Sequence, residues 1–210
     1  MAEGTKENHF EDDVVKSLVT HSKYIQQDTS VYDKELCLIP DDIIAFVKDT
    51  QVDAYQKLEE QYGAETDRKI VENVAKSINT NKTVQVLREG TIKDRGVKLK
   101  MAFFKPNHNR TPEHLEKYEQ NRLTVIRQLK YSKQNENCLD IGIFINGIPV
   151  ITMELKNALT GQYLSQAIDQ YKNDRDSREK LFEFQRCLVH FAVSTESVAM
   201  TTQLKDKQTY

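Results

Sequence analysis

Two apolar runs separated by Asn146-Gly147 constrain the fold of this chain more than any other feature. In "CLDIGIFINGIPVITMELKN", residues 138–157, β-branched and aromatic residues stand on both sides of that dipeptide. Asn-Gly is favoured in tight hairpin turns because both residues tolerate positive φ. The sequence therefore predicts two antiparallel strands, and it places Asp140, Glu154 and Lys156 near their outer ends.

The register of this hairpin decides whether the three charged residues share a face. If Asn146-Gly147 alone formed the loop, Leu139 would face Glu154, and Asp140 would lie on the other side of the sheet. A three-residue loop, 145–147, with Gly147 in the left-handed conformation, would instead put Asp140 opposite Thr152. Only this second register brings both acids and the lysine onto one face, unless a bulge compensates a two-residue loop.

Carboxylates that converge in this way indicate a cation site and a hydrolytic reaction. Two carboxylates repel each other unless a hard cation lies between them, and an all-oxygen set suits Mg²⁺ or Mn²⁺. A lysine on the same face can position or help deprotonate a metal-activated water and stabilise charge at a phosphate. The pattern therefore indicates phosphodiester hydrolysis.

The acid-x-Lys triplet alone is weak evidence, because it also arises by chance. Asp67-Arg68-Lys69 is a second copy, in polar helical sequence where no strand pair would bring another acid near it. An alternative interpretation is that Asp140 ends a strand, that Glu154 and Lys156 form a surface pair, and that nothing reacts.

The rest of the chain predicts an α/β fold with a mixed sheet. Apolar periodicity indicates helices from Phe10 onward and over 41–63 and 67–80, so about residues 1–80 should be helical. Alternating β-branched residues predict two strands within 82–106, starting near Val84 and joined by a turn at "KDRG". A short helix capped by Thr111, with Pro112 at its first position, should follow. Further segments are a strand over 122–132, the hairpin, a helix over 159–175, and strands over 186–194 and 197–204.

Composition fits a single soluble globular unit. The chain has 210 residues, 38% hydrophobic and 30% charged, with a net charge of -2, so a nucleic-acid surface must be a local patch. Three cysteines without a CxxC spacing indicate free thiols in a reducing compartment. We expect no signal peptide, no membrane span and no nucleotide-phosphate loop, because the corresponding patterns are absent.

Residues 139–157 resemble the Asp…Glu-x-Lys core of the PD-(D/E)xK nuclease superfamily, and more narrowly the N-terminal nuclease domain of the type I restriction enzyme R subunit. Other stretches resemble that family too: "VQVLREGTIKDRGVKLKMAFFKP", "NRLTVIRQLKYS", "KNALTGQ", "AIDQYKNDRD" and "RCLVHFAVSTESVAMTT". The resemblance covers roughly residues 10–202. It implies a restriction-endonuclease-like fold, a mixed sheet flanked by helices, as one domain over residues 1–210.

The resemblance also implies roles for individual residues. Asp140 and Glu154 would be metal ligands, Lys156 the catalytic lysine, and the Leu155 carbonyl a further ligand for Mg²⁺ or Mn²⁺. The family's early glutamate best matches Glu11, which would complete the metal shell or, alternatively, be a solvated acid at a helix start.

Related nucleases carry a Gln-x-x-x-Tyr element on the helix after the triad. Here Gln166 and Tyr171 are five residues apart, and Gln170 directly precedes the tyrosine, so either glutamine could face the site. Alternatively, this is a helix surface on which Tyr171 is half buried.

Basic residues downstream could contact DNA phosphates without reading sequence. They are Lys172, Arg175, Arg178 and Arg186, although interleaved acids also fit a solvated face. A second phosphate-facing edge could follow the strands expected within 82–106, through Arg88, Lys93, Arg95, Lys98, Lys100 and Lys105.

The family context implies cutting of double-stranded DNA, non-specifically and after translocation by a larger complex. That complex has a specificity subunit and a modification (methyltransferase) subunit, and ATP is used by motor domains that follow the nuclease. Since motor motifs are absent here, we expect a piece of a longer cytoplasmic protein and ATP use only in that parent. Competing hypotheses are a stand-alone repair nuclease with the same core and a non-catalytic docking module.

Overall fold

The computed structural model describes residues 3–107, 112–157, 161 and 163–204. Its helices are α1 (Glu3–Ser22), α2 (Pro40–Thr50), α3 (Val52–Tyr62), α4 (Thr66–Glu89), α5 (Pro112–Glu119) and α6 (Leu164–Asp169). Its strands are β1 (Ile25–Gln27), β2 (Leu123–Lys130), β3 (Cys138–Ile145), β4 (Ile148–Lys156), β5 (Val189–Ser194) and β6 (Val198–Thr201). A π-helical segment, Gln170–Asp174, follows α6, and short 3-10 helices lie at Thr29–Val31, Gly63–Glu65 and Lys180–Phe182.

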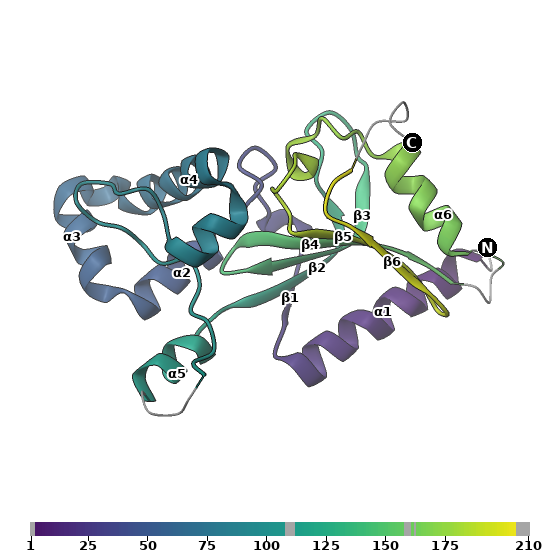
Figure 1. Ribbon diagram of the computed structural model, residues 1–210, viewed down its shortest axis with the longest axis horizontal. Coiled ribbons are helices and arrows are strands. Elements are labelled where there is room, and N and C mark those ends of the chain that lie inside the picture. The colour runs from purple at the N-terminus through teal and green to yellow at the C-terminus, as the bar shows by residue number, and fades with distance from the viewer. Residues whose placement is uncertain (1–2, 108–111, 158–160, 162, 205–210) are drawn as a thin grey trace.

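The strands form one six-stranded mixed sheet in the order β1-β2-β3-β4-β5-β6. The β1–β2 and β4–β5 pairs are parallel, and the other three pairs are antiparallel. Helix α1 contacts β2 and β4, whereas α6 contacts β4, β5 and β6, and the two helices lie on opposite sides of the sheet (Figure 1). The predicted α/β fold with a mixed sheet flanked by helices is confirmed.

Helices α2, α3 and α4 gather at one end of the sheet (Figure 1). The helix expected over 41–63 is divided at Gln51, whose backbone is not helical (φ -141°, ψ 50°). The Gln51 side chain pairs with the backbone of Lys100, donating to its carbonyl at 2.9 Å and accepting from its N–H at 2.8 Å. The side-chain amide of Gln51 thus holds the backbone of Lys100 in place, and helix α3 begins at the residue after Gln51.

The strands expected within 82–106 are wrong. Residues 82–89 continue α4 beyond a kink at Lys82 (φ 67°), and residues 91–106 contribute no strand to the sheet. Val86, Leu99 and Met101 are buried in a core cluster with the helices, so burial rather than strand pairing explains these apolar residues. Consequently the six basic residues from Arg88 to Lys105 do not alternate along a sheet.

The turn at "KDRG" is present, with Arg95 and Gly96 at positive φ and a bridge between Asp94 and Val97. The first strand of the sheet is β1, which the sequence did not predict. Helix α5 and the strands expected over 122–132, 138–156, 186–194 and 197–204 are confirmed, while Thr111, the expected cap of α5, lies outside the described residues.

Two hydrophobic clusters fill the two sides of the sheet. The first lies under α1 and the helical end, and it includes Val15, Ile141 and Ile143. The second includes Leu129 and Phe144 together with Tyr171 of the segment that follows α6. All three cysteines are free thiols, and none of the described helices combines the length and apolar character that crossing a bilayer requires.

Candidate active site

The hairpin turn contains two residues, not the three of the register that would put Asp140 opposite Thr152. Asn146 (φ 49°) and Gly147 (φ 79°) form the loop, and Ile145 pairs with Ile148. A Cβ on Gly147 would lie 2.4 Å from the Ile39 carbonyl oxygen, so the turn fits closely against the start of α2. Of the two registers that the sequence left open, the structure therefore has the two-residue loop.

A β-bulge then shifts the pairing of β3 and β4 by one residue. Phe144 pairs with Pro149, but Ile143 pairs with Ile151, so Val150 is the extra residue on β4. Proline has no N–H to donate to a ladder, which is why proline inside a strand commonly marks a bulge. The bulge compensates the two-residue loop.

Beyond the bulge, Gly142 pairs with Thr152 and Ile141 with Met153. Continuing this register by one step places Asp140 opposite Glu154. Glu154 and Lys156, two residues apart on β4, lie on one face of the sheet. The charge of Asp140 acts on the Glu154 carboxyl group, so the two acids lie close together.

The ladder between β3 and β4 ends after Ile141–Met153, while β4 continues to pair with β5 through Lys156. In the gap, Asp140 Oδ2 accepts a hydrogen bond from the Leu155 N–H at 2.6 Å. A strand residue directs its N–H and C=O to the same neighbour, so the Leu155 carbonyl also points into this gap. The gap therefore collects two carboxylates and one backbone carbonyl.

Glu154 is 0% exposed and is only half satisfied by hydrogen bonds. Its Oε1 accepts from Arg175 Nε at 2.7 Å, while its Oε2 is buried and has no hydrogen-bond partner among the described residues. Burial, together with the charge of Asp140, raises the pKa of Glu154 to about 8. An unsatisfied buried carboxylate oxygen is costly, and a cation at that oxygen would relieve the cost.

Arg175 lies in the site and not on an exposed DNA-facing surface. Its side chain is 9% exposed, and its guanidinium sits between Glu154 and the ring of Tyr131, 5.9 Å from the ring centroid. Burial alone would lower the pKa of Arg175, but the hydrogen bond to Glu154 raises it above its ordinary value.

The other downstream basic residues have different surroundings. Arg178 is exposed and pairs with Asp176, and Lys172 lines a cavity of about 220 Å³ beside Tyr171. Arg186 is buried, donating to Asn79 and to the Leu36 carbonyl, so it ties the helical end to the sheet instead of facing DNA.

Glu11 is 2% exposed, so it is not the solvated acid of the alternative interpretation. It lies within α1, and its Oε2 accepts from Arg127 Nε at 2.6 Å. The amide nitrogen of Gln128 lies 3.0 Å from both Glu11 oxygens and 3.4 Å from Asp140 Oδ1. One glutamine thus connects Glu11 to the site.

Lys156 is 9% exposed and borders a polar depression of about 290 Å³. Gln166 and Gln170 both line that depression, and within the described part of the chain the buried side-chain oxygen of Gln170 has no hydrogen-bond partner. Gln166 also accepts from the Tyr163 N–H at 2.7 Å, which caps α6. Both glutamines therefore lie beside the catalytic lysine that the family resemblance implies.

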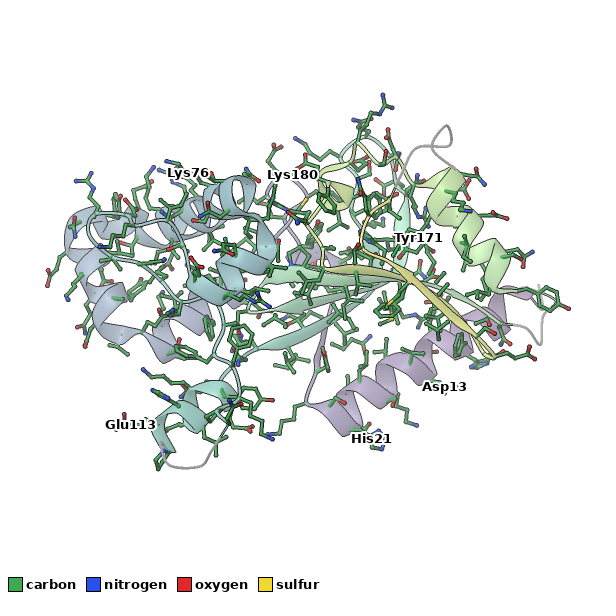
Figure 2. The ribbon with its side chains drawn as sticks, viewed as in Figure 1. Asp13, His21, Lys76, Glu113, Tyr171 and Lys180 are labelled. Carbon is green, nitrogen blue, oxygen red and sulfur yellow. The ribbon has the colours of Figure 1, made fainter. Side chains whose placement is uncertain are left out.

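Tyr171 is buried, not half exposed, and lies close to the sheet where the helical segment ends (Figure 2). Its hydroxyl is 2.8 Å from Thr152 Oγ1, which is 2.7 Å from His190 Nδ1. The five-residue interval from Gln166 ends in the π-helical segment, where hydrogen bonds span five residues, as from the Arg175 N–H to the Gln170 carbonyl. The wider turn accommodates the one extra residue.

The donor set suits a hard cation. Two carboxylates and a backbone carbonyl, with water, match the oxygen ligands that Mg²⁺ and Mn²⁺ prefer, and the orphaned Glu154 oxygen gives such a cation a place to bind. Among the described residues, no three His, Cys, Asp or Glu side chains gather closely enough to hold a metal by themselves. The fit thus depends on the two hairpin acids and Leu155, with Glu11 further out.

Sequence reasoning missed Gln128, Thr152 and His190, and it assigned Arg175 to the wrong surroundings. For Gln128 a signal existed: the consecutive polar residues Arg127-Gln128 interrupt the alternation of "RLTVIRQLKYS". No local signal marks the other three, because their positions depend on how α6 packs on the sheet.

Comparison with known proteins gives one match to a family. The sequence model of the family described as "Type I restriction enzyme R protein N terminus" matches residues 5–209. No curated protein matches the chain.

Proposed function

The chain belongs to the family of type I restriction enzyme R protein N termini, and from this premise we propose that it is the metal-dependent endonuclease domain of an R subunit. The observation that carries the proposal is the gap at the end of the β3–β4 ladder. There, Asp140 accepts from the Leu155 N–H and lies close to the half-satisfied Glu154, and Lys156 follows Glu154 on the same face of β4.

Mg²⁺ or Mn²⁺ would be held by Asp140, Glu154 and the Leu155 carbonyl, and it would supply a water of lowered pKa and Lewis-acid stabilisation of the phosphate. The protein prepares these ligands in advance. The Leu155 N–H fixes the Asp140 carboxylate, and Arg175 holds one oxygen of Glu154, which leaves the other oxygen for the cation.

Lys156 would orient the attacking water and stabilise charge that develops on the phosphate. Its position at the edge of a polar depression gives a phosphodiester a way to approach it. Gln166 and Gln170 would hold the water or a phosphate oxygen in that depression. Contacts to phosphates carry no sequence information, so the domain would cut double-stranded DNA without sequence recognition.

In the parent complex, specificity and modification subunits would choose the DNA, and ATP-driven motor domains would translocate it before this domain cuts. Lys172 and Arg178 would contact phosphates beside the site. We expect this complex to act in the cytoplasm, where its DNA substrate is found.

Titration of the chain with Mn²⁺ by calorimetry tests the metal site. Asp140→Asn should abolish or strongly weaken binding, whereas Asp67→Asn, in the chance copy of the triplet on α4, should leave it unchanged. Equal binding by both variants and the wild type would favour the docking module over the nuclease.

A further inference from the structure

Two consecutive strand residues, Arg127 and Gln128, contact the same carboxylate. Arg127 Nε lies 2.6 Å from Glu11 Oε2, and Gln128 Nε2 lies 3.0 Å from each Glu11 oxygen. Successive side chains of a regular strand point to opposite faces of the sheet, so a regular β2 could not do this.

The backbone of Gln128 breaks the alternation. Its φ is 50°, a left-handed conformation that a non-glycine strand residue adopts only at a cost in free energy. The pairing on either side is undisturbed, since Arg127 pairs with Ile141 and Leu129 with Leu139, which leaves Gln128 opposite Asp140. The side chains nevertheless change face at Gln128. Ile126 and Leu129 are three residues apart and would lie on opposite faces of a regular strand, yet both belong to the same core cluster.

The Gln128 side chain is oriented by its partners at both ends. Its oxygen accepts from the Cys138 thiol at 2.9 Å, so its nitrogen faces the carboxylates, reaching Glu11 and, at 3.4 Å, Asp140 Oδ1. An amide nitrogen has two hydrogens and can serve two acids. Because the amide is uncharged, it joins Glu11 and Asp140 without adding a second positive charge to that of Arg127.

We propose that Gln128 is a positioning residue of the cation site. It holds Glu11 of α1 against Asp140 of β3, across the sheet, and thereby sets the affinity of the site for the cation. This inference rests on the proposed nuclease function, and it explains why a strained backbone is retained at this position.

The test replaces the amide without disturbing the backbone. Gln128→Gly adopts φ 50° without strain, which offsets part of the cost of losing the hydrogen bonds to the buried Glu11, so the variant should remain folded in EDTA. Its Mn²⁺ affinity, measured by calorimetry, should fall about 10- to 100-fold. Gln128→Asn, which tolerates the same φ but has a shorter side chain, should weaken binding as well. Arg95→Gly is the matched control, because Arg95 has the same φ of 50° in an exposed turn far from the acids, and its Mn²⁺ affinity should be unchanged.

A double-variant cycle with Glu11→Gln separates positioning from a general structural effect. If Gln128 acts by placing Glu11, then Gln128→Gly should add little to the loss already caused by Glu11→Gln. Wild-type Mn²⁺ affinity in Gln128→Gly, or fully additive losses in the double variant, would overturn the inference. These outcomes leave the proposed function standing as long as Asp140→Asn still abolishes binding; if Asp140→Asn binds like the wild type, the cation site itself falls.

Discussion

The buried Glu154 should make the cation-free protein less stable as pH rises, over a range in which most proteins change little. Its pKa rises from the ordinary 4.5 to about 8 because it is buried beside Asp140. The folded state therefore holds this proton more tightly than the unfolded state. The stabilisation is complete below about 4.5, and it is lost as pH rises through about 8.

The size of the effect follows from the same values. Each unit of pKa corresponds to about 1.4 kcal/mol, so the change from 4.5 to about 8 gives at most roughly 5 kcal/mol. His190 acts in the opposite sense at the acid end, because burial lowers its pKa to about 4 and stability falls as pH drops below its ordinary 6.5. The difference between wild type and Glu154→Gln cancels the His190 contribution and isolates Glu154.

Urea unfolding in EDTA, at about pH 5, about pH 7 and about pH 9, measures this difference. Wild type should lose several kcal/mol relative to Glu154→Gln between the first and last condition, since glutamine does not titrate. Glu72→Gln, in an exposed salt bridge on α4, should keep the wild-type slope. The same pH slope in wild type and Glu154→Gln would refute the reasoning, because Glu154 would then be ordinary in the folded state.

Three other variants test separate parts of the structure. Arg175→Met leaves the Glu154 carboxylate buried without its ion-pair partner, so we expect a loss of about 3–5 kcal/mol at about pH 9, and a loss below 1 kcal/mol in urea unfolding would contradict the pairing. Tyr171→Phe removes the hydroxyl that meets Thr152 and should cost about 1 kcal/mol with unchanged Mn²⁺ binding; a loss of Mn²⁺ affinity in calorimetry would instead give Tyr171 a role in the site. Gly147→Ala places a Cβ 2.4 Å from the Ile39 carbonyl oxygen at a φ of 79°, so thermal unfolding should show a loss of more than about 1 kcal/mol, and wild-type stability would mean that the turn is not held as described.

The fold was predictable where local patterns and tertiary burial agree. The Asn146-Gly147 turn, β2 and the last two strands follow from alternation and turn residues, and the structure has them. The prediction of strands within residues 82–106 was wrong because Val86, Leu99 and Met101 are apolar in order to pack in the core, in α4 and in the segment after it. An alternating apolar pattern does not distinguish such a segment from a strand.

The candidate site, like the fold, was predictable from the sequence only in part. The sequence predicted that Asp140, Glu154 and Lys156 lie near one end of the hairpin but left its register open, and Pro149 was the overlooked signal for the bulge that sets it. The position of Arg175 on Glu154 could not be predicted, because it depends on a π-helical turn after α6 that no local pattern announces. The polar pair Arg127-Gln128 marks an irregular position in β2, but the partners of Gln128 are known only from its φ value and its three contacts.

The most direct test of the account is cleavage of supercoiled plasmid, with Mg²⁺ and ATP, by the restriction complex rebuilt with Lys156→Ala. Lys69→Ala is the matched control, since it belongs to the chance copy of the triplet and pairs with Glu72 on the surface of α4. We predict that Lys156→Ala abolishes cutting while ATP hydrolysis continues, and that Lys69→Ala cuts like the wild type. Unchanged cutting by Lys156→Ala would contradict the central claim that the chemistry takes place at this hairpin.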